Sequence, residues 1–145
     1  MPKWRILAVD DEPYALCLIS EILKNESCVV ETAANASIAW EKLNAPERQF
    51  NFAILDRMMP GIDGIELLRM IKADSRLKTM PVVIQSGASS PEQIAEGIEA
   101  GAFYYLTKPY VPKALQAIVR AIMADIELRA EVSVQTARYV QSLKY

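Results

Sequence analysis

The chain has 145 residues, of which 52% are hydrophobic, and it carries a net charge of −2. This size and composition fit one domain with a substantial core, and no apolar run reaches the length of about 18 residues that would indicate a membrane span. The chain contains no histidine, which excludes imidazole general bases, histidine-dependent triads and most zinc chemistry. Lysine and arginine are scattered rather than clustered, which argues weakly against nucleic acid as a direct partner.

The amino-terminal residues lead directly into a strand-like run and show no signal-peptide pattern. We therefore expect a cytoplasmic protein with no membrane partner. Cys17 and Cys28 lie in apolar segments, and we expect both to be reduced core residues rather than a disulfide.

Segments with strand character alternate with segments of helical periodicity along the whole chain. The expected strands are residues 6–9, 29–33, 52–56, 81–84 and 103–107. The expected helices are residues 13–25, 36–43, 65–71, 91–100 and 112–126. In the second of these helices, Ile38, Ala39 and Leu43 are expected to face inward. This alternation predicts an α/β fold with a doubly wound, five-stranded parallel sheet, right-handed crossovers and helices on both faces.

Polar side chains follow four of these strands where each strand ends. They are Asp10 and Asp11 after the first, Asp56 at the end of the third, Ser86 after the fourth and Lys108 after the fifth. In an open parallel sheet these positions meet at one edge. Three clustered carboxylates repel one another unless a cation joins them, and Mg²⁺ is the natural cation for oxygen ligands. Together with a hydroxyl and a lysine, they predict a site where a carboxylate accepts a phosphoryl group.

Four separated motifs together are typical of one known protein family: LAVDDEP, AILDRMMPGIDG, VVIQSGAS and YYLTKP. In this order they resemble the CheY-like receiver domains of two-component response regulators, over about residues 4–126. The resemblance implies a flavodoxin-like sheet with strand order 2-1-3-4-5. It also implies a signalling phosphoacceptor domain that catalyses only its own phosphotransfer and dephosphorylation, and is not otherwise an enzyme.

The resemblance further implies which residues accept the phosphoryl group and hold the metal. Asp56 would be the phosphoacceptor, supplied by a sensor histidine kinase or a histidine phosphotransfer protein in an Mg²⁺-dependent reaction. Asp10, Asp11, Asp56 and the backbone carbonyl of Met58 would form the metal site. Of the acidic pair, Asp11 would be the more direct ligand.

The same resemblance implies the residues that bind the phosphoryl oxygens and respond to them. Ser86 and Lys108 would contact these oxygens, and Ser86 and Tyr105 would switch a protein-interaction face. The Lys108–Pro109 bond would be cis. Each residue also has a plainer alternative: the acidic pair as a helix cap, Ser86 as a turn hydroxyl and Tyr105 as a half-buried strand residue.

Two features depart from the family pattern. Gln85 is polar at the end of a strand that the family usually keeps apolar, and Phe103 and Tyr104 replace a frequent acidic pair. We expect both departures to affect the partner face rather than the acceptor.

Two rival functions each need a residue or motif that this sequence lacks. A haloacid dehalogenase-type hydrolase needs a second aspartate two residues after the nucleophile, where Met58 stands. A nucleotide-binding fold needs a glycine-rich loop after the first strand, where Asp-Asp-Glu-Pro stands. The remaining alternative is a pseudo-receiver, a binding module that acts without phosphorylation.

The end of the chain is expected to be separate from the receiver domain, which we place at residues 1–126. Residues 127–145 would extend the last helix or form a linker, and they are too few for an output domain. The chain is therefore a stand-alone receiver or a piece of a longer protein. Leu128, Val132, Tyr139 and Leu143 form a second apolar face, for which we hypothesise a homodimer contact; the alternative is a frayed terminus.

Overall fold

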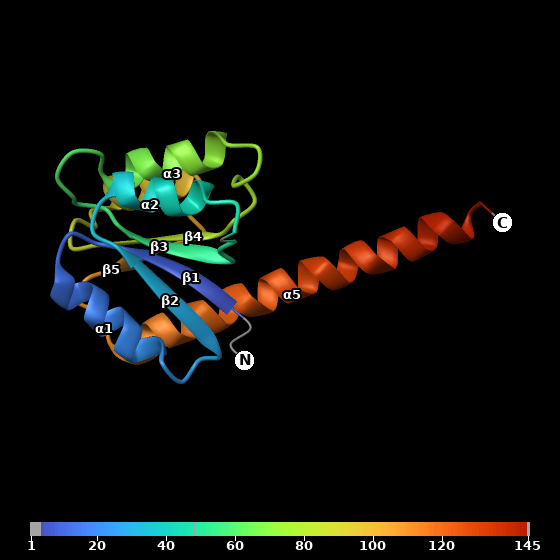
Figure 1. Ribbon diagram of the computed structural model, residues 1–145, viewed down its shortest axis with the longest axis horizontal. Coiled ribbons are helices and arrows are strands. Elements are labelled where there is room, and N and C mark those ends of the chain that lie inside the picture. Colours follow the sequence, from blue (N-terminus) through green and yellow to red (C-terminus); the bar gives the residue numbers. More distant parts are fainter. Residues whose placement is uncertain (1–3, 48, 145) are drawn as a thin grey trace.

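A five-stranded parallel sheet forms the centre of the molecule (Figure 1). The computed structural model describes residues 4–47 and 49–144. The strands are β1 (Trp4–Val9), β2 (Cys28–Ala33), β3 (Phe52–Asp56), β4 (Val82–Ser86) and β5 (Tyr104–Thr107). Their order across the sheet is β2-β1-β3-β4-β5, which confirms the predicted fold class and strand order.

Helices follow the strands in the described part of the chain. They are α1 (Pro13–Leu23), α2 (Ala36–Asn44), α3 (Gly64–Ala73), α4 (Pro91–Glu99) and α5 (Pro112–Ser142). Figure 1 shows α1 and α5 on one face of the sheet and α2 and α3 on the other. Among the described residues, no helix combines the length and apolar character needed to cross a membrane.

The helix starts follow local capping rules. The side chains of Asn35 and Asp63 each accept a backbone N–H from three residues further on, at 2.8 and 2.9 Å. Ser90 and Gln93 form a reciprocal capping box at the start of α4. These caps satisfy N–H groups that have no partner within the helix, and they fix where each helix leaves its loop.

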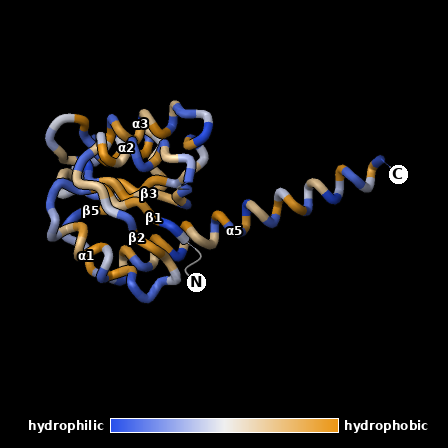
Figure 2. Tube along the Cα trace, in the orientation of Figure 1, coloured by the Kyte–Doolittle hydropathy of each residue, from blue (hydrophilic) through white to orange (hydrophobic). Residues whose placement is uncertain are grey.

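The central strand β3 is buried along its whole length, as its continuous apolar run predicts for a strand covered on both faces. Figure 2 shows the apolar residues gathered in β1 and β3, between the helical layers. β2 lies at one edge of the sheet, which agrees with its lower apolar content. Asn51 extends the pairing of β3 with β1, because its side chain accepts the backbone N–H of Arg5 at 2.8 Å.

Two residues expected to face inward do not. Cys17 of α1 and Ile38 of α2 are both exposed, and Cys28 is half-buried. The buried residues of α1 are Ile19, Ile22 and Leu23, and at 100° per residue they lie on the side opposite Cys17. Both cysteines are free thiols in this structure.

The last helix continues far beyond the body of the domain. α5 buries Leu115, Val119 and Ile122 against the sheet, and residues 127–144 are then exposed. Because α5 begins after β5 and runs antiparallel to the strands, its extension leaves at the edge where the strands begin (Figure 1). The segment 127–145 is thus helical through Ser142; Tyr145 and residues 1–3 lie outside the described residues.

Gly64, the first residue of α3, packs directly against the end of β3. A Cβ atom at this position would overlap the carbonyl oxygen of Asp56 and lie 2.9 Å from the Cα atom of Arg57. We expect Gly64→Ala to lower the free energy of unfolding by about 1–3 kcal/mol, the usual cost of overpacking, as measured by urea denaturation. Gly87→Ala is the control, because its Cβ would meet no described atom within 4 Å. Equal losses in the two variants would contradict this account.

Candidate functional site

Three carboxylates meet at the carboxyl edge of the sheet. Asp10 and Asp11 directly follow β1, and Asp56 is the last residue of β3. One oxygen of each lies within 4.8 Å of the others. Asp10 and Asp56 are buried, whereas Asp11 is exposed. The structure therefore brings together the acidic residues that the sequence placed at strand ends.

Lys108 lies between the two buried carboxylates. Its Nζ atom is 3.1 Å from Oδ2 of Asp10 and 3.0 Å from Oδ1 of Asp56. Its backbone N–H donates to the carbonyl of Ser86 at 2.8 Å, and the Lys108–Pro109 bond is cis, as expected. Among the described residues, one ammonium faces the three clustered carboxylates, so two of their negative charges are left uncompensated. This balance suits a divalent cation.

Burial and the neighbouring charges shift the ionisation of the site. Burial raises the pKa of the Asp56 carboxyl, and repulsion from Asp10 and Asp11 adds to the rise, although Lys108 opposes it. Burial by itself would lower the pKa of Lys108, but its hydrogen bonds and ion pairs with Asp56 and Asp10 raise it. Attraction outweighs burial for Lys108 because it faces two carboxylates. Burial outweighs attraction for Asp56 because it shares a single ammonium with Asp10. The site consequently keeps its lysine charged and favours additional positive charge.

Asp10 and Asp11 are held in different ways. Oδ1 of Asp10 accepts the N–H of Glu12 at 2.9 Å, and Oδ2 accepts Lys108 Nζ and the more distant Gln85 Nε2 at 3.4 Å. Both oxygens of Asp10 are therefore engaged, while the exposed Asp11 faces solvent. This arrangement suits Asp11 better than Asp10 for direct contact with an ion.

Ser86 and Tyr105, the two expected switch residues, are joined through the backbone of Ala88. Ser86 is buried at the end of β4, and its Oγ accepts the N–H of Ala88 at 2.9 Å. The hydroxyl of Tyr105 donates to the carbonyl of the same Ala88. The bond between Ser86 and Ala88 is local, and it is the kind of bond that the alternative of a turn hydroxyl anticipates. The sequence does not indicate the bond of Tyr105, because it depends on the loop after β4 lying against β5.

The expectation that Gln85 affects the partner face rather than the acceptor site is wrong, because its side chain contacts the acidic cluster. Gln85 is fully buried, its Nε2 donates to Asp10, and its Oε1 accepts the hydroxyl of Tyr110 at 2.9 Å. Burial raises the pKa of Tyr110, so the phenol keeps the proton that it donates. Gln85 thus connects the acidic cluster to the loop before α5. The only sign of this role in the sequence was a polar Gln85 within an otherwise apolar strand.

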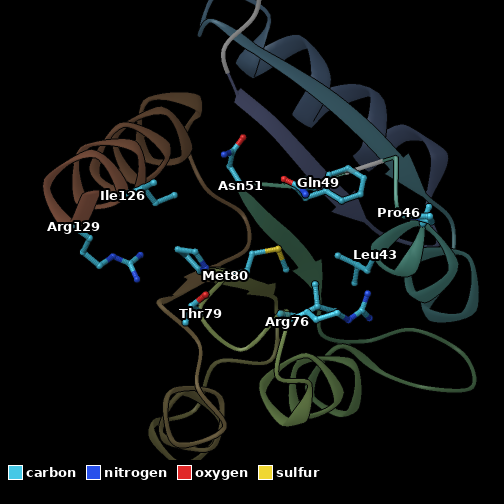
Figure 3. A pocket seen from close by; sticks show the side chains of 13 residues that line it. Leu43, Pro46, Gln49, Asn51, Arg76, Thr79, Met80, Ile126 and Arg129 are labelled. Carbon is cyan, nitrogen blue, oxygen red and sulfur yellow. The ribbon is translucent and has the colours of Figure 1, made fainter. Parts of the chain in front are cut away.

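Met58, the expected source of a backbone carbonyl ligand, lies two residues beyond Asp56, and it is 63% exposed. It lies in the loop between β3 and α3. A cavity of about 630 Å³ lies instead at the opposite edge of the sheet, where Leu43, Asn51, Met80 and Ile126 contribute to its lining (Figure 3). None of its lining residues belongs to the acidic cluster. The cavity is thus separate from the candidate site.

The sequence matches the family model for the response regulator receiver domain over residues 6–120. Response regulator RppA of Synechocystis sp. is 36% identical over 118 residues, which are 81% of this chain and 50% of that protein. Two-component response regulator ARR17 of Arabidopsis thaliana is 39% identical over 114 residues, 72% of this chain and 74% of that protein. The structure of Vibrio cholerae chemotaxis protein CheY4 is 30% identical, with a TM-score of 0.76, covering 82% of this chain and 98% of that one. This chain spans about half the length of RppA.

The Gln85–Tyr110 bond can be tested through its contribution to stability. Gln85→Leu leaves the Tyr110 hydroxyl without its acceptor, so we expect the free energy of unfolding to fall by about 1–3 kcal/mol. Tyr110→Phe removes the same bond from the other side. We expect the double variant to lose less free energy of unfolding than the sum of the two single losses, by at least about 0.5 kcal/mol. Urea denaturation of all three variants measures this. Strictly additive losses would show that the two side chains do not interact.

Proposed function

Because this chain belongs to the response regulator receiver domain family of two-component systems, we propose that Asp56 accepts a phosphoryl group from a histidine of another protein. The donor would be a sensor histidine kinase or a histidine phosphotransfer protein, since this chain contains no histidine. The observation that carries the proposal is the position of Asp56 at the buried end of the central strand, beside two further carboxylates and Lys108. The domain would act as a signalling phosphoacceptor and transform no other substrate.

The chain's own groups fit the chemistry of this transfer. A carboxylate oxygen of Asp56 would attack phosphorus, forming a P–O bond as the P–N bond to the donor imidazole breaks and the leaving nitrogen takes a proton. Lys108, 3.0 Å from Oδ1 of Asp56, would bind an oxygen of the incoming group. Oγ of Ser86 accepts an N–H from Ala88, which leaves its hydroxyl hydrogen free to donate to a second phosphoryl oxygen.

The metal site of the proposal is formed by Asp10, Asp11, Asp56 and the carbonyl of Met58. The oxygen-only ligand set and the two uncompensated negative charges fit Mg²⁺. Bound Mg²⁺ would neutralise charge that builds up on the transferred group. Asp11 would be the more direct ligand of the acidic pair, because both oxygens of Asp10 are already engaged.

Phosphorylation would change a protein-interaction face through Ser86 and Tyr105. A Ser86 hydroxyl drawn toward the phosphoryl group would disturb its bond to Ala88, whose carbonyl binds Tyr105. Tyr105 lies in β5 beside the exposed Phe103 and Tyr104, so a downstream protein would read the surface of α4, β5 and α5. The alternative function is a pseudo-receiver, in which this surface binds a partner without phosphorylation.

A cytoplasmic location is part of the proposal. Cys17 and Cys28 are both free thiols, and Cys17 is exposed. Reducing compartments maintain thiols in this state.

The acceptor and metal roles can be tested together with acetyl phosphate and Mg²⁺. Asp56→Asn should abolish base-labile phosphate incorporation, read as a mass increase, because no other nucleophile occupies its place. Asp11→Ala should weaken Mg²⁺ binding and slow the reaction. Asp63→Asn is the control, since asparagine also caps α3, and it should be labelled normally. Undiminished labelling of Asp56→Asn would overturn the acceptor assignment, and absence of labelling in the natural chain would favour the pseudo-receiver.

A homodimer through the extension of α5 is the second proposed interaction. Leu128, Val132, Tyr139 and Leu143 are all more than half exposed, and at 100° per residue they lie within about 60° of one another around the helix. The stripe continues toward the body through exposed alanines at positions 117, 121 and 124. Unpacked helices of about 15 residues are marginal in water, and β-branched Val132 and Val134 favour helix poorly. A second copy of the same stripe would supply the missing packing.

Val132 and Val134 provide a matched test of the dimer. Each is 51% exposed, but Val134 lies off the stripe. We expect Val132→Glu to weaken association at least about tenfold, because dimerisation would bury its charge. Val134→Glu should sediment as the natural chain does. Monomers at every concentration, with and without phosphorylation, would exclude this contact, as would equal effects of the two substitutions.

A further inference from the structure

Arg57, the residue directly after Asp56, makes contacts that the phosphoacceptor role does not use. Its side chain is only 10% exposed. Nη1 donates to the backbone carbonyl of Gln93 at 2.7 Å and to the hydroxyl of Tyr105 at 3.2 Å, and Nη2 pairs with Glu96. The guanidinium carbon lies 5.9 Å from the centre of the Tyr105 ring, within range of a cation–π interaction. Arg57 therefore joins the acceptor strand to α4 and β5.

The backbone of Arg57 is fixed as well. Its N–H donates to the carbonyl of Gln85 at 2.9 Å, and its carbonyl accepts the N–H of Gly64 at 3.0 Å. These bonds hold Arg57 between the end of β4 and the first residue of α3. Asp56 is thus one peptide unit away from a residue whose side chain binds α4.

Tyr105 is held in a buried position by groups of the chain itself. It is 7% exposed. Its hydroxyl donates to the carbonyl of Ala88 and accepts from Arg57, and its ring packs on Gly97, where a Cβ would lie 2.7 Å from the ring. Only glycine at this point of α4 leaves room for the ring, and none of these contacts requires a phosphoryl group.

The contacts of Arg57 make the buried position of Tyr105 more stable than an outward one. If Tyr105 turned outward, Arg57 would lose a hydrogen-bond acceptor and an aromatic neighbour while remaining mostly buried. Nη1 carries two hydrogens, so the N–H that donates to Tyr105 would be unpaired even with Gln93 and Glu96 still bound. An unpaired N–H of a buried charged group costs more than an ordinary hydrogen bond contributes. Arg57 therefore biases Tyr105 toward its buried position, and its bonds to Gln93 and Glu96 bias α4 in the same direction.

We propose that Arg57 is a positioning residue that keeps Tyr105 buried and α4 docked before phosphorylation, so that the protein-interaction face of this domain is largely preformed. The meaning of Tyr105 as a switch rests on the proposed function. The restraint that Arg57 imposes rests on the contacts alone. Phosphorylation would then add to an arrangement that Arg57 already stabilises.

The test uses the full chain with fluorotyrosine in place of its six tyrosines. The ¹⁹F resonance of Tyr105 is assigned with Tyr105→Phe, and its solvent exposure is measured with a soluble paramagnetic reagent, without and then with acetyl phosphate and Mg²⁺. Backbone hydrogen exchange of α4 is measured on the same samples. Arg57→Met keeps an unbranched side chain of similar reach but removes the charge and donors, and Arg57→Lys restores the charge. Arg69→Met, on the exposed side of α3, controls for loss of one positive charge.

We expect Tyr105 to be shielded in the unphosphorylated natural chain and in Arg69→Met. In Arg57→Met it should become accessible, α4 amides should exchange about tenfold faster, and phosphorylation should restore part of the shielding. Arg57→Lys should fall between the two. The inference is overturned if Tyr105 is accessible in the unphosphorylated natural chain, or if Arg57→Met leaves both its shielding and α4 exchange unchanged.

A second pair of variants guards against an unfolded Arg57→Met protein. Glu96→Gln weakens the ion pair with Arg57, whereas Glu99→Gln removes a charge from the end of the same helix. Faster α4 exchange in Glu96→Gln alone supports the inference, and equal exchange in the two contradicts it. Phosphate incorporation is followed by mass in every sample. A natural chain that takes up no phosphate overturns the proposed function only, because the shielding of Tyr105 by Arg57 is measured without phosphorylation.

Discussion

The closeness of three carboxylates at the end of a buried sheet is the constraint on which this structure depends. Removing charges from water is costly unless partners compensate them, and the part of the chain that the structure describes supplies one ammonium here, from Lys108. Asp10 is stabilised further by the backbone of Glu12 and by Gln85, whereas Asp56 is less compensated, and its pKa is raised chiefly by burial. A site left with excess negative charge favours a cation, and that cation in turn favours the approach of an anionic group.

The surroundings of the site connect this edge to the surface. Ser86 contacts Ala88, Ala88 contacts Tyr105, and Tyr105 contacts Arg57, the residue that directly follows Asp56. The N–H of Arg57 donates to the carbonyl of Gln85, the neighbour of Ser86, so these contacts form a closed ring. In the proposed switch, a small displacement at Asp56 would reach α4 through these contacts.

The two edges of the sheet have separate roles. The acidic cluster occupies the edge where the strands end, and α5 carries its exposed extension away from the edge where the strands begin (Figure 1). Leu115, Val119 and Ile122 hold α5 against the sheet between these two regions. Any influence of the site on the extension, or the reverse, has to pass through this packing, because the helix is otherwise exposed beyond residue 126.

The sequence by itself determined the elements, their order and the strand-end positions of Asp10, Asp11, Asp56, Ser86 and Lys108, because hydrophobic periodicity and turn residues act over a few neighbouring positions. It failed for Cys17 and Ile38, where apolar character was present but the buried face of the helix lay elsewhere. It marked Gln85 as unusual without supplying its partners, and it gave no role to Arg57. Those roles required Tyr110, Gln93, Glu96 and Tyr105 to arrive from distant segments. Only the tertiary structure decided them, because the direction of a long polar side chain depends on which acceptors the packing of other elements brings within about 3 Å.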